Sequence, residues 1–75
     1  MMTLPAFLRA YGAILGRHHD LPEVVFKDVI EQAKATIVDG RAGWTHTTPA
    51  AIAAWQQIGG IGNPTMKSLR ALPRS

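Results

Sequence analysis

The stretch "WQQIGGIGNPTMKSLRAL", residues 55 to 72, places three glycines and a proline between two segments with helical spacing. Upstream, Thr48 followed by Pro49 is a strong helix start, because a hydroxyl can cap the first turn and proline suits its first position. Asn63 and Pro64 repeat that pairing after the glycines. The stretch therefore predicts two helices, over about 49 to 58 and 64 to 72, joined by a glycine turn.

Apolar side chains recur at helical spacing on both sides of this turn. The residues expected to face inward are Ala51, Ala54, Trp55 and Ile58 before the turn and Met66, Leu69 and Leu72 after it.

Two more helices are expected upstream. Thr3 can cap a helix over about 4 to 16, which Gly16 ends. Asp20 and Glu23 have capping-box spacing at the start of a helix over about 21 to 39, which Gly40 ends. No segment shows strand-type alternation, and no repeat is present. The sequence thus predicts an all-α fold in which residues 1 to 75 form a single domain of four helices.

Size and composition restrict the classes of protein. The 75 residues include no cysteine, which excludes disulfides and thiolate metal sites and favours a cytoplasmic protein. The apolar N-terminus lacks signal-peptide features, and no apolar run is long enough to span a bilayer, so no membrane association is expected. A core this small also favours homodimerisation as a source of stability.

Charge is distributed unevenly along this chain of net charge +3. All five acids lie between residues 20 and 39. Residues 40 to 75 contain no acid and four basic residues, namely Arg41, Lys67, Arg70 and Arg74. A segment with only positive charge suits a phosphate backbone or an acidic protein surface, although it can also be a solvated basic tail.

The glycine stretch resembles the helix-hairpin-helix motif, in which two short helices flank a Gly-hydrophobic-Gly turn. Ile58, Gly60, Ile61 and Gly62 match that pattern, whereas Met66 stands where the family usually has alanine. The segment "GIGNPTMKSLRAL" is also similar to the closing part of the C-terminal domain in the alpha subunit of RNA polymerase. The resemblance implies contact with the DNA sugar-phosphate backbone, largely without base reading, sometimes with a monovalent cation held by hairpin carbonyls.

The residues themselves suggest a phosphate site at this hairpin. Glycines let a ligand approach the backbone, and the first turn of the next helix has unpaired N–H groups. Hydroxyl and basic side chains follow within one turn. The candidate nucleic-acid-binding residues are Gly60, Gly62, Asn63, Thr65, Lys67, Arg70 and Arg74, with Ser68 as a further hydroxyl. The alternative is an ordinary turn, in which the glycines only end one helix before the next begins.

Two other functions compete with this hypothesis. In a helix-turn-helix regulator, Gly60 and Ile61 would form the turn and residues 64 to 72 the recognition helix. In a small protein-interaction module of phage or plasmid type, Arg41 and Trp44 would contribute to an interface with a host protein complex, which the module would inhibit or redirect. Trp44 could instead cover the core beneath its loop.

Enzymatic and metal chemistry are not expected. The glycine stretch lacks the Lys-Ser/Thr ending of a nucleotide-binding loop, and no nucleophile motif is present. His18, His19, Asp20 and the distant His46 lack metal-ligand spacing. The sequence therefore predicts a small, basic, non-enzymatic DNA-binding protein with an accessory or regulatory role, without cofactor or metal.

Overall fold

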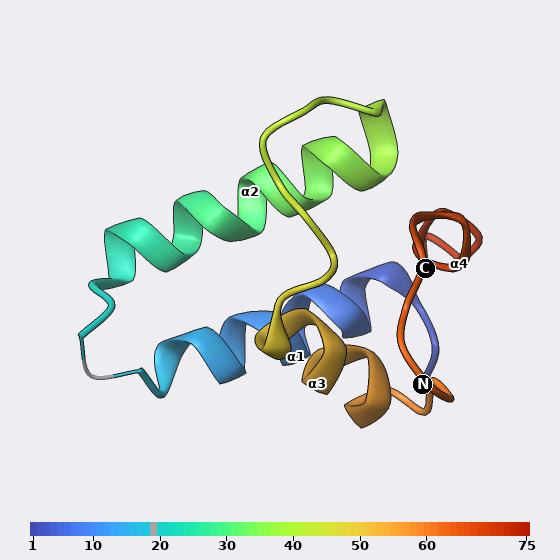
Figure 1. The fold of residues 1–75 in the computed structure, drawn as a ribbon, viewed down its shortest axis with the longest axis horizontal. Coiled ribbons are helices and arrows are strands. Elements are labelled where there is room, and N and C mark those ends of the chain that lie inside the picture. Colours follow the sequence, from blue (N-terminus) through green and yellow to red (C-terminus); the bar gives the residue numbers. More distant parts are fainter. Residues whose placement is uncertain (19) are drawn as a thin grey trace.

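The computed structural model describes residues 1–18 and 20–75, and all regular secondary structure in this part of the chain is helical. Helix α1 covers Leu4–Gly16, α2 covers Glu23–Asp39, α3 covers Pro49–Gln57 and α4 covers Met66–Arg70 (Figure 1). The prediction of an all-α fold with four helices is confirmed. None of the helices in the described ranges combines the length and the apolar character that crossing a bilayer requires.

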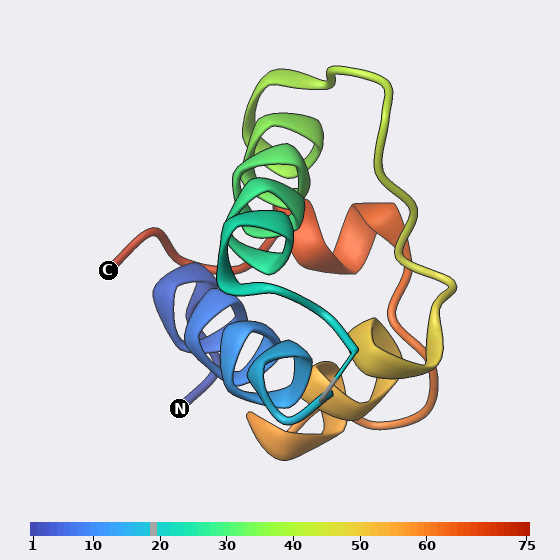
Figure 2. The ribbon, with the colours of Figure 1, turned by 90° about the vertical axis from the view of Figure 1, so that its left-hand side faces the viewer.

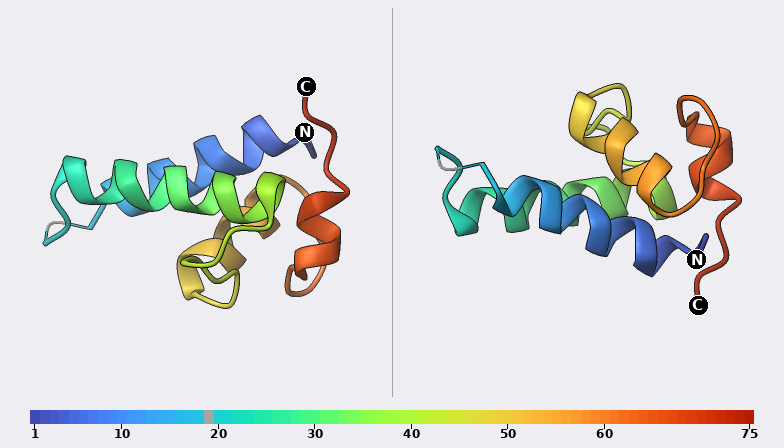
Figure 3. Two further views of the ribbon diagram at one scale, coloured as in Figure 1. Left: turned by 90° about the horizontal axis from the view of Figure 1, so that it is seen from above. Right: turned by 90° about the horizontal axis from the view of Figure 1, so that it is seen from below.

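Helix α1 organises the arrangement. Both α2 and α3 pack against it, and α4 packs against α2. In Figure 2, which looks nearly along α1 and α2, α3 and α4 lie on the same side of that pair. Figure 3 shows α4 at the end of the molecule where α2 finishes and where both chain termini lie. The termini are joined there, because the Leu4 N–H donates to the Pro73 carbonyl at 2.8 Å.

Two helices begin where the sequence predicts, because a threonine caps each of them. The Thr3 Oγ1 accepts a hydrogen bond from the Ala6 N–H at 3.2 Å, and the Thr48 Oγ1 accepts one from the Ala51 N–H at 3.3 Å. Such caps pair N–H groups that have no partner inside the helix. Helix α1 ends at Gly16 as predicted, and α3 ends one residue earlier than predicted, at Gln57.

The start of α2 corrects a sequence prediction. The helix begins at Glu23 after Pro22, which has extended backbone and makes no side-chain cap. The capping box between Asp20 and Glu23 is absent, since the Glu23 carboxylate pairs with the Lys27 ammonium at 2.9 Å. Pro22 explains the difference, because a residue before proline is disfavoured in the helical conformation, so that the helix starts after it. The predicted stop at Gly40 is correct, with φ of +70°.

The start of α4 corrects another sequence prediction. The prediction of Asn63 as cap and Pro64 as first helical residue is wrong, because Thr65 caps a helix that begins at Met66. The Thr65 Oγ1 accepts from the Ser68 N–H at 3.0 Å, and the Ser68 Oγ accepts from the Thr65 N–H at 2.8 Å. This reciprocal pair satisfies two backbone donors, which an asparagine cap cannot do alone. Helix α4 ends at Arg70 and not at 72.

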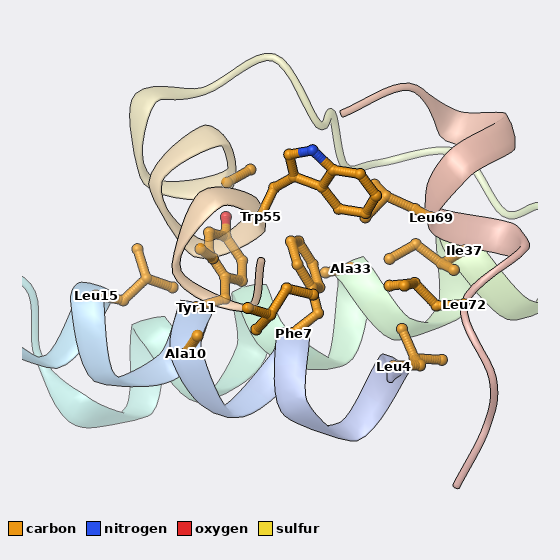
Figure 4. Packing of buried hydrophobic residues seen from close by; sticks show 13 residues of the cluster. Leu4, Phe7, Ala10, Tyr11, Leu15, Ala33, Ile37, Trp55, Leu69 and Leu72 are labelled. Atoms are coloured by element: carbon orange, nitrogen blue, oxygen red, sulfur yellow. The ribbon is translucent and has the colours of Figure 1, made fainter. Parts of the chain in front are cut away.

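Buried apolar residues from all four helices form one cluster (Figure 4). Phe7, Ile37 and Leu69 are its largest fully buried side chains and come from α1, α2 and α4. The indole of Trp55 extends from α3 above Phe7 toward Leu69. Close packing of this kind stabilises the fold through the burial of apolar surface. The inward-facing residues predicted for the last two helices are buried, except Met66, which is partly buried.

Candidate nucleic-acid interface

The glycine turn after α3 is a Schellman motif. The Gly59 N–H donates to the Gln56 carbonyl at 3.1 Å, and the Gly60 N–H donates to the Trp55 carbonyl at 2.9 Å. Gly59 has φ of +106°, the left-handed region in which glycine is favoured. The glycines therefore end α3, as the alternative sequence interpretation predicts.

Gly60 has a second structural role. A Cβ at this position would overlap the Trp55 indole, so only glycine lets the ring lie against the backbone. The Trp55 Nε1–H also donates to the Ile61 carbonyl at 3.4 Å. The Gly60 N–H is not available to a ligand, because it is bonded to the Trp55 carbonyl. Gly62 differs, since nothing lies within 4 Å of the position that its Cβ would occupy.

The first turn of α4 offers less to a phosphate than the sequence suggests. Besides the reciprocal bonds of its capping box, the Ser68 Oγ–H donates to the Thr65 carbonyl at 2.8 Å. The Ser68 hydroxyl proton and the Thr65 and Ser68 N–H groups are thus used within the cap, whereas the Thr65 hydroxyl only accepts there and keeps its own proton to donate. Ser68 therefore has no side-chain donor left for a phosphate, the Thr65 hydroxyl stays a candidate phosphate ligand, and Asn63, although exposed, caps no helix.

Three basic side chains of the C-terminal segment, Lys67, Arg70 and Arg74, form a surface that we call the basic corner. Lys67 and Arg70 lie three residues apart on α4. The Arg74 Nη1–H donates to the Arg70 carbonyl at 3.2 Å and to the Leu72 carbonyl at 2.9 Å. Arg74 therefore binds the carbonyls at the end of α4, where a positive charge is favourable.

Arg70 connects the basic corner to α2. Its Nη2 lies 3.9 Å from the position that a Cβ on Gly40 would occupy. The guanidinium thus lies beside the C-terminal end of α2, where the negative end of the helix dipole attracts it. The packing of α4 on α2 therefore determines the position of the Arg70 guanidinium.

The basic corner has no acidic partner within the described residues. The one ion pair among the described residues joins Lys27 and Glu23, which both lie on α2. Lys67, Arg70 and Arg74 are all exposed. Their charges consequently remain available to an anionic ligand.

Arg41 and Trp44, the residues of the protein-interface hypothesis, differ in exposure, since Arg41 is exposed and Trp44 is partly buried. Arg41 lines a shallow hollow with Glu31 and Gln32 of α2, and Trp44 is not among its lining residues. Trp44 is partly buried, and its Nε1–H donates to the Tyr11 Oη at 3.0 Å. The rings meet edge to face, with centroids 5.9 Å apart. Trp44 therefore fastens the loop after α2 onto α1.

Ile61 is a surface residue that sequence reasoning missed. Its side chain is 94% exposed, the highest fraction among the large hydrophobic residues of the described chain. It lies between Gly60 and Gly62, in the connection formed by residues 58–65. Ile61 follows Trp55 and Ile58 at helical spacing, but α3 ends before it and its side chain lies outside the core. The consecutive glycines at 59 and 60 are the sequence signal for that end.

The connection between α3 and α4 bears on two sequence hypotheses. Residues 58–65 separate the helices, whereas a helix-turn-helix usually has a turn of three or four residues. Helix α4 packs against α2, and its five residues give a short recognition helix. The geometry thus does not favour a helix-turn-helix, while the helix-hairpin-helix resemblance stays a prediction.

The described residues contain no candidate metal site. Among residues 1–18 and 20–75, no three histidine, aspartate or glutamate side chains come together in a way that could hold a metal ion. His18 and Asp20 are exposed, and His19 lies outside the described residues.

Comparisons with known proteins found no matching family model, no similar curated protein and no similar solved structure. The charges and exposed side chains of the chain itself are therefore the basis for assigning a function.

Proposed function

We propose that this protein binds the phosphate groups of duplex DNA. It would act as a cytoplasmic accessory or regulatory factor without enzymatic activity. The observation that supports the proposal is the basic corner, whose three cations are exposed and have no acidic partner in the described chain. Lysine and arginine in such a setting bind phosphates and release the counterions condensed on DNA.

The distribution of acids gives the protein a preferred orientation toward DNA. The acidic residues belong to α2 and the short segment before it. The start of α2 points away from the end where α4 lies (Figure 3), whereas Asp39, the last residue of α2, lies at the same end as the basic corner. A polyanion is therefore repelled from the start of α2, where Glu23 lies, and attracted to the basic corner.

Binding of this kind is expected to be largely independent of sequence. Base reading needs side chains that donate and accept hydrogen bonds at base edges. The Ser68 hydroxyl is committed to the cap of α4, which leaves the Asn63 amide and the Thr65 hydroxyl as the exposed polar side-chain groups of the connection. The other groups of the basic corner are cations, which position a protein on DNA without specifying sequence.

A protein partner is the second candidate, and the exposure of Ile61 favours it. An exposed aliphatic side chain, together with cations that have no acidic partner in the described chain, also suits an acidic protein surface with an apolar centre. In that case the protein would act as an interaction module on a host complex and would not bind DNA.

The proposal is tested by electrophoretic shift of random-sequence duplex DNA at about 50 and 200 mM salt. Lys67→Glu/Arg70→Glu is compared with Arg9→Glu/Arg17→Glu, which makes the same change in net charge at exposed positions of α1 and at its cap. We expect the wild type and the α1 variant to shift DNA at low salt and the α4 variant to fail. Circular dichroism confirms that each variant is folded. Equal binding by both variants would contradict the proposal, and no shift by the wild type would favour the protein partner.

A further inference from the structure

The connection between α3 and α4 presents one apolar side chain to solvent. The other highly exposed aliphatic side chain of the described chain outside the first residues, Val24, is 75% exposed and lies on a helix. Ile61 instead stands on a connection with a glycine on each side. It is therefore the apolar group best placed to enter a narrow space.

The backbone at Ile61 is held on both sides. Its carbonyl accepts the Trp55 indole N–H, and the preceding Gly60 N–H is bonded to the Trp55 carbonyl. Downstream, Pro64 is buried. An apolar side chain on an anchored backbone loses less conformational entropy when it inserts into a partner.

The part of the connection around Ile61, which we call the tip, is also narrow. Neither neighbour of Ile61 has a side chain, and the space around the Cβ position of Gly62 is empty to 4 Å. The minor groove of B-DNA is about 6 Å wide, which excludes a helix but admits a single side chain.

The separation between Ile61 and the cations of the basic corner allows both to contact the same DNA duplex. Ile61 and Lys67 are six positions apart in the sequence, which is at most about 20 Å of extended chain. One turn of duplex is about 34 Å long, so both residues can contact a single turn. The basic corner can then hold the phosphates while Ile61 reaches the bases.

We infer that Ile61 inserts as a wedge between adjacent base pairs from the minor groove and bends the duplex. The inference rests on the proposed DNA binding. Proteins that insert isoleucine, leucine or phenylalanine in this way partly unstack a base step, and the buried side chain offsets that cost. The protein would consequently favour DNA that is already easy to unstack, such as TA steps or a mismatch.

The test measures bending by energy transfer between dyes at the ends of a short duplex, and affinity for a mismatched against a fully paired duplex. The variant is Ile61→Ala, and the control is Val24→Ala, an exposed aliphatic position on α2. We expect Ile61→Ala to abolish the bend and to remove the preference for mismatched DNA, because without the wedge the cost of unstacking a base step no longer enters the binding. Val24→Ala should match the wild type in both measurements.

The outcomes separate this inference from the function on which it rests. If Ile61→Ala bends and discriminates DNA like the wild type, the wedge is wrong while DNA binding stands. If the wild type fails to bind duplex DNA, the proposed function is wrong and the wedge with it. Binding to anionic phospholipid vesicles that depends on Ile61, with DNA left straight, would overturn the wedge in favour of a membrane partner.

Discussion

The Trp55 indole lies against the backbone of Gly60 and occupies the space that a side chain there would need. The same ring donates a hydrogen bond to the Ile61 carbonyl at 3.4 Å and contributes to the buried cluster. One aromatic residue thus links the core, the end of α3 and the exposed tip. The glycine that the sequence suggests as a ligand contact is explained by packing.

Replacing Gly60 by alanine should destabilise the fold. The new methyl group must displace the Trp55 ring, and overpacking of this kind costs about 1 to 3 kcal/mol. Gly62→Ala is the comparison, because its Cβ would meet empty space and only the left-handed φ of +68° opposes it, at about 1 kcal/mol. Urea denaturation followed by tryptophan fluorescence measures both. A smaller loss of stability for Gly60→Ala than for Gly62→Ala would show that the ring does not fill this space.

The cap of α4 leads to a second prediction. Thr65→Ala removes the hydroxyl that accepts the Ser68 N–H and should lower the free energy of unfolding by about 1 kcal/mol. Asn63→Ala should change it by less than about 0.5 kcal/mol, because Asn63 is exposed and caps nothing. Thermal denaturation of the two variants distinguishes the observed cap from the one that the sequence suggests. The reverse order of effects would mean that α4 begins at Pro64.

A third prediction concerns the loop after α2. The hydrogen bond from Trp44 to Tyr11 should contribute about 1 kcal/mol to stability. A double-mutant cycle with Trp44→Phe and Tyr11→Phe measures the coupling, because each change removes one partner and keeps an aromatic ring. DNA affinity should be unchanged in all three variants. Zero coupling would mean that the loop is not fastened through this bond, and a loss of DNA binding would place Trp44 in the interface.

Local sequence signals predict much of the fold. Threonine followed within two residues by proline marks the starts of α1 and α3, and Gly40 marks the end of α2. Where two signals compete, prediction fails. The spacing of Asp20 and Glu23 suggests a capping box, but Pro22 delays the helix. Asn63 with Pro64 suggests a start, but Thr65 and Ser68 satisfy more backbone donors.

The candidate site is less predictable because tertiary contacts arrange it. Spacing along α4 places Lys67 and Arg70 on one side of a helix, but only packing brings Arg70 beside Gly40. The packing of Trp55 on Gly60 and the exposure of Ile61 likewise depend on the path of the chain after α3. Composition alone predicts the basic character of the segment, since residues 40 to 75 contain no acid.

The most direct test of DNA binding by the basic corner is the salt dependence of affinity for random-sequence duplex. The slope of log Kobs against log salt concentration falls in magnitude by about 0.9 for each phosphate that the protein no longer neutralises. We predict that Lys67→Gln/Arg70→Gln reduces the magnitude of the wild-type slope by roughly 2, since each cation binds one phosphate. Arg9→Gln/Arg17→Gln, with the same change in net charge outside the basic corner, should keep the wild-type slope. An unchanged slope in the Lys67→Gln/Arg70→Gln variant would contradict the account.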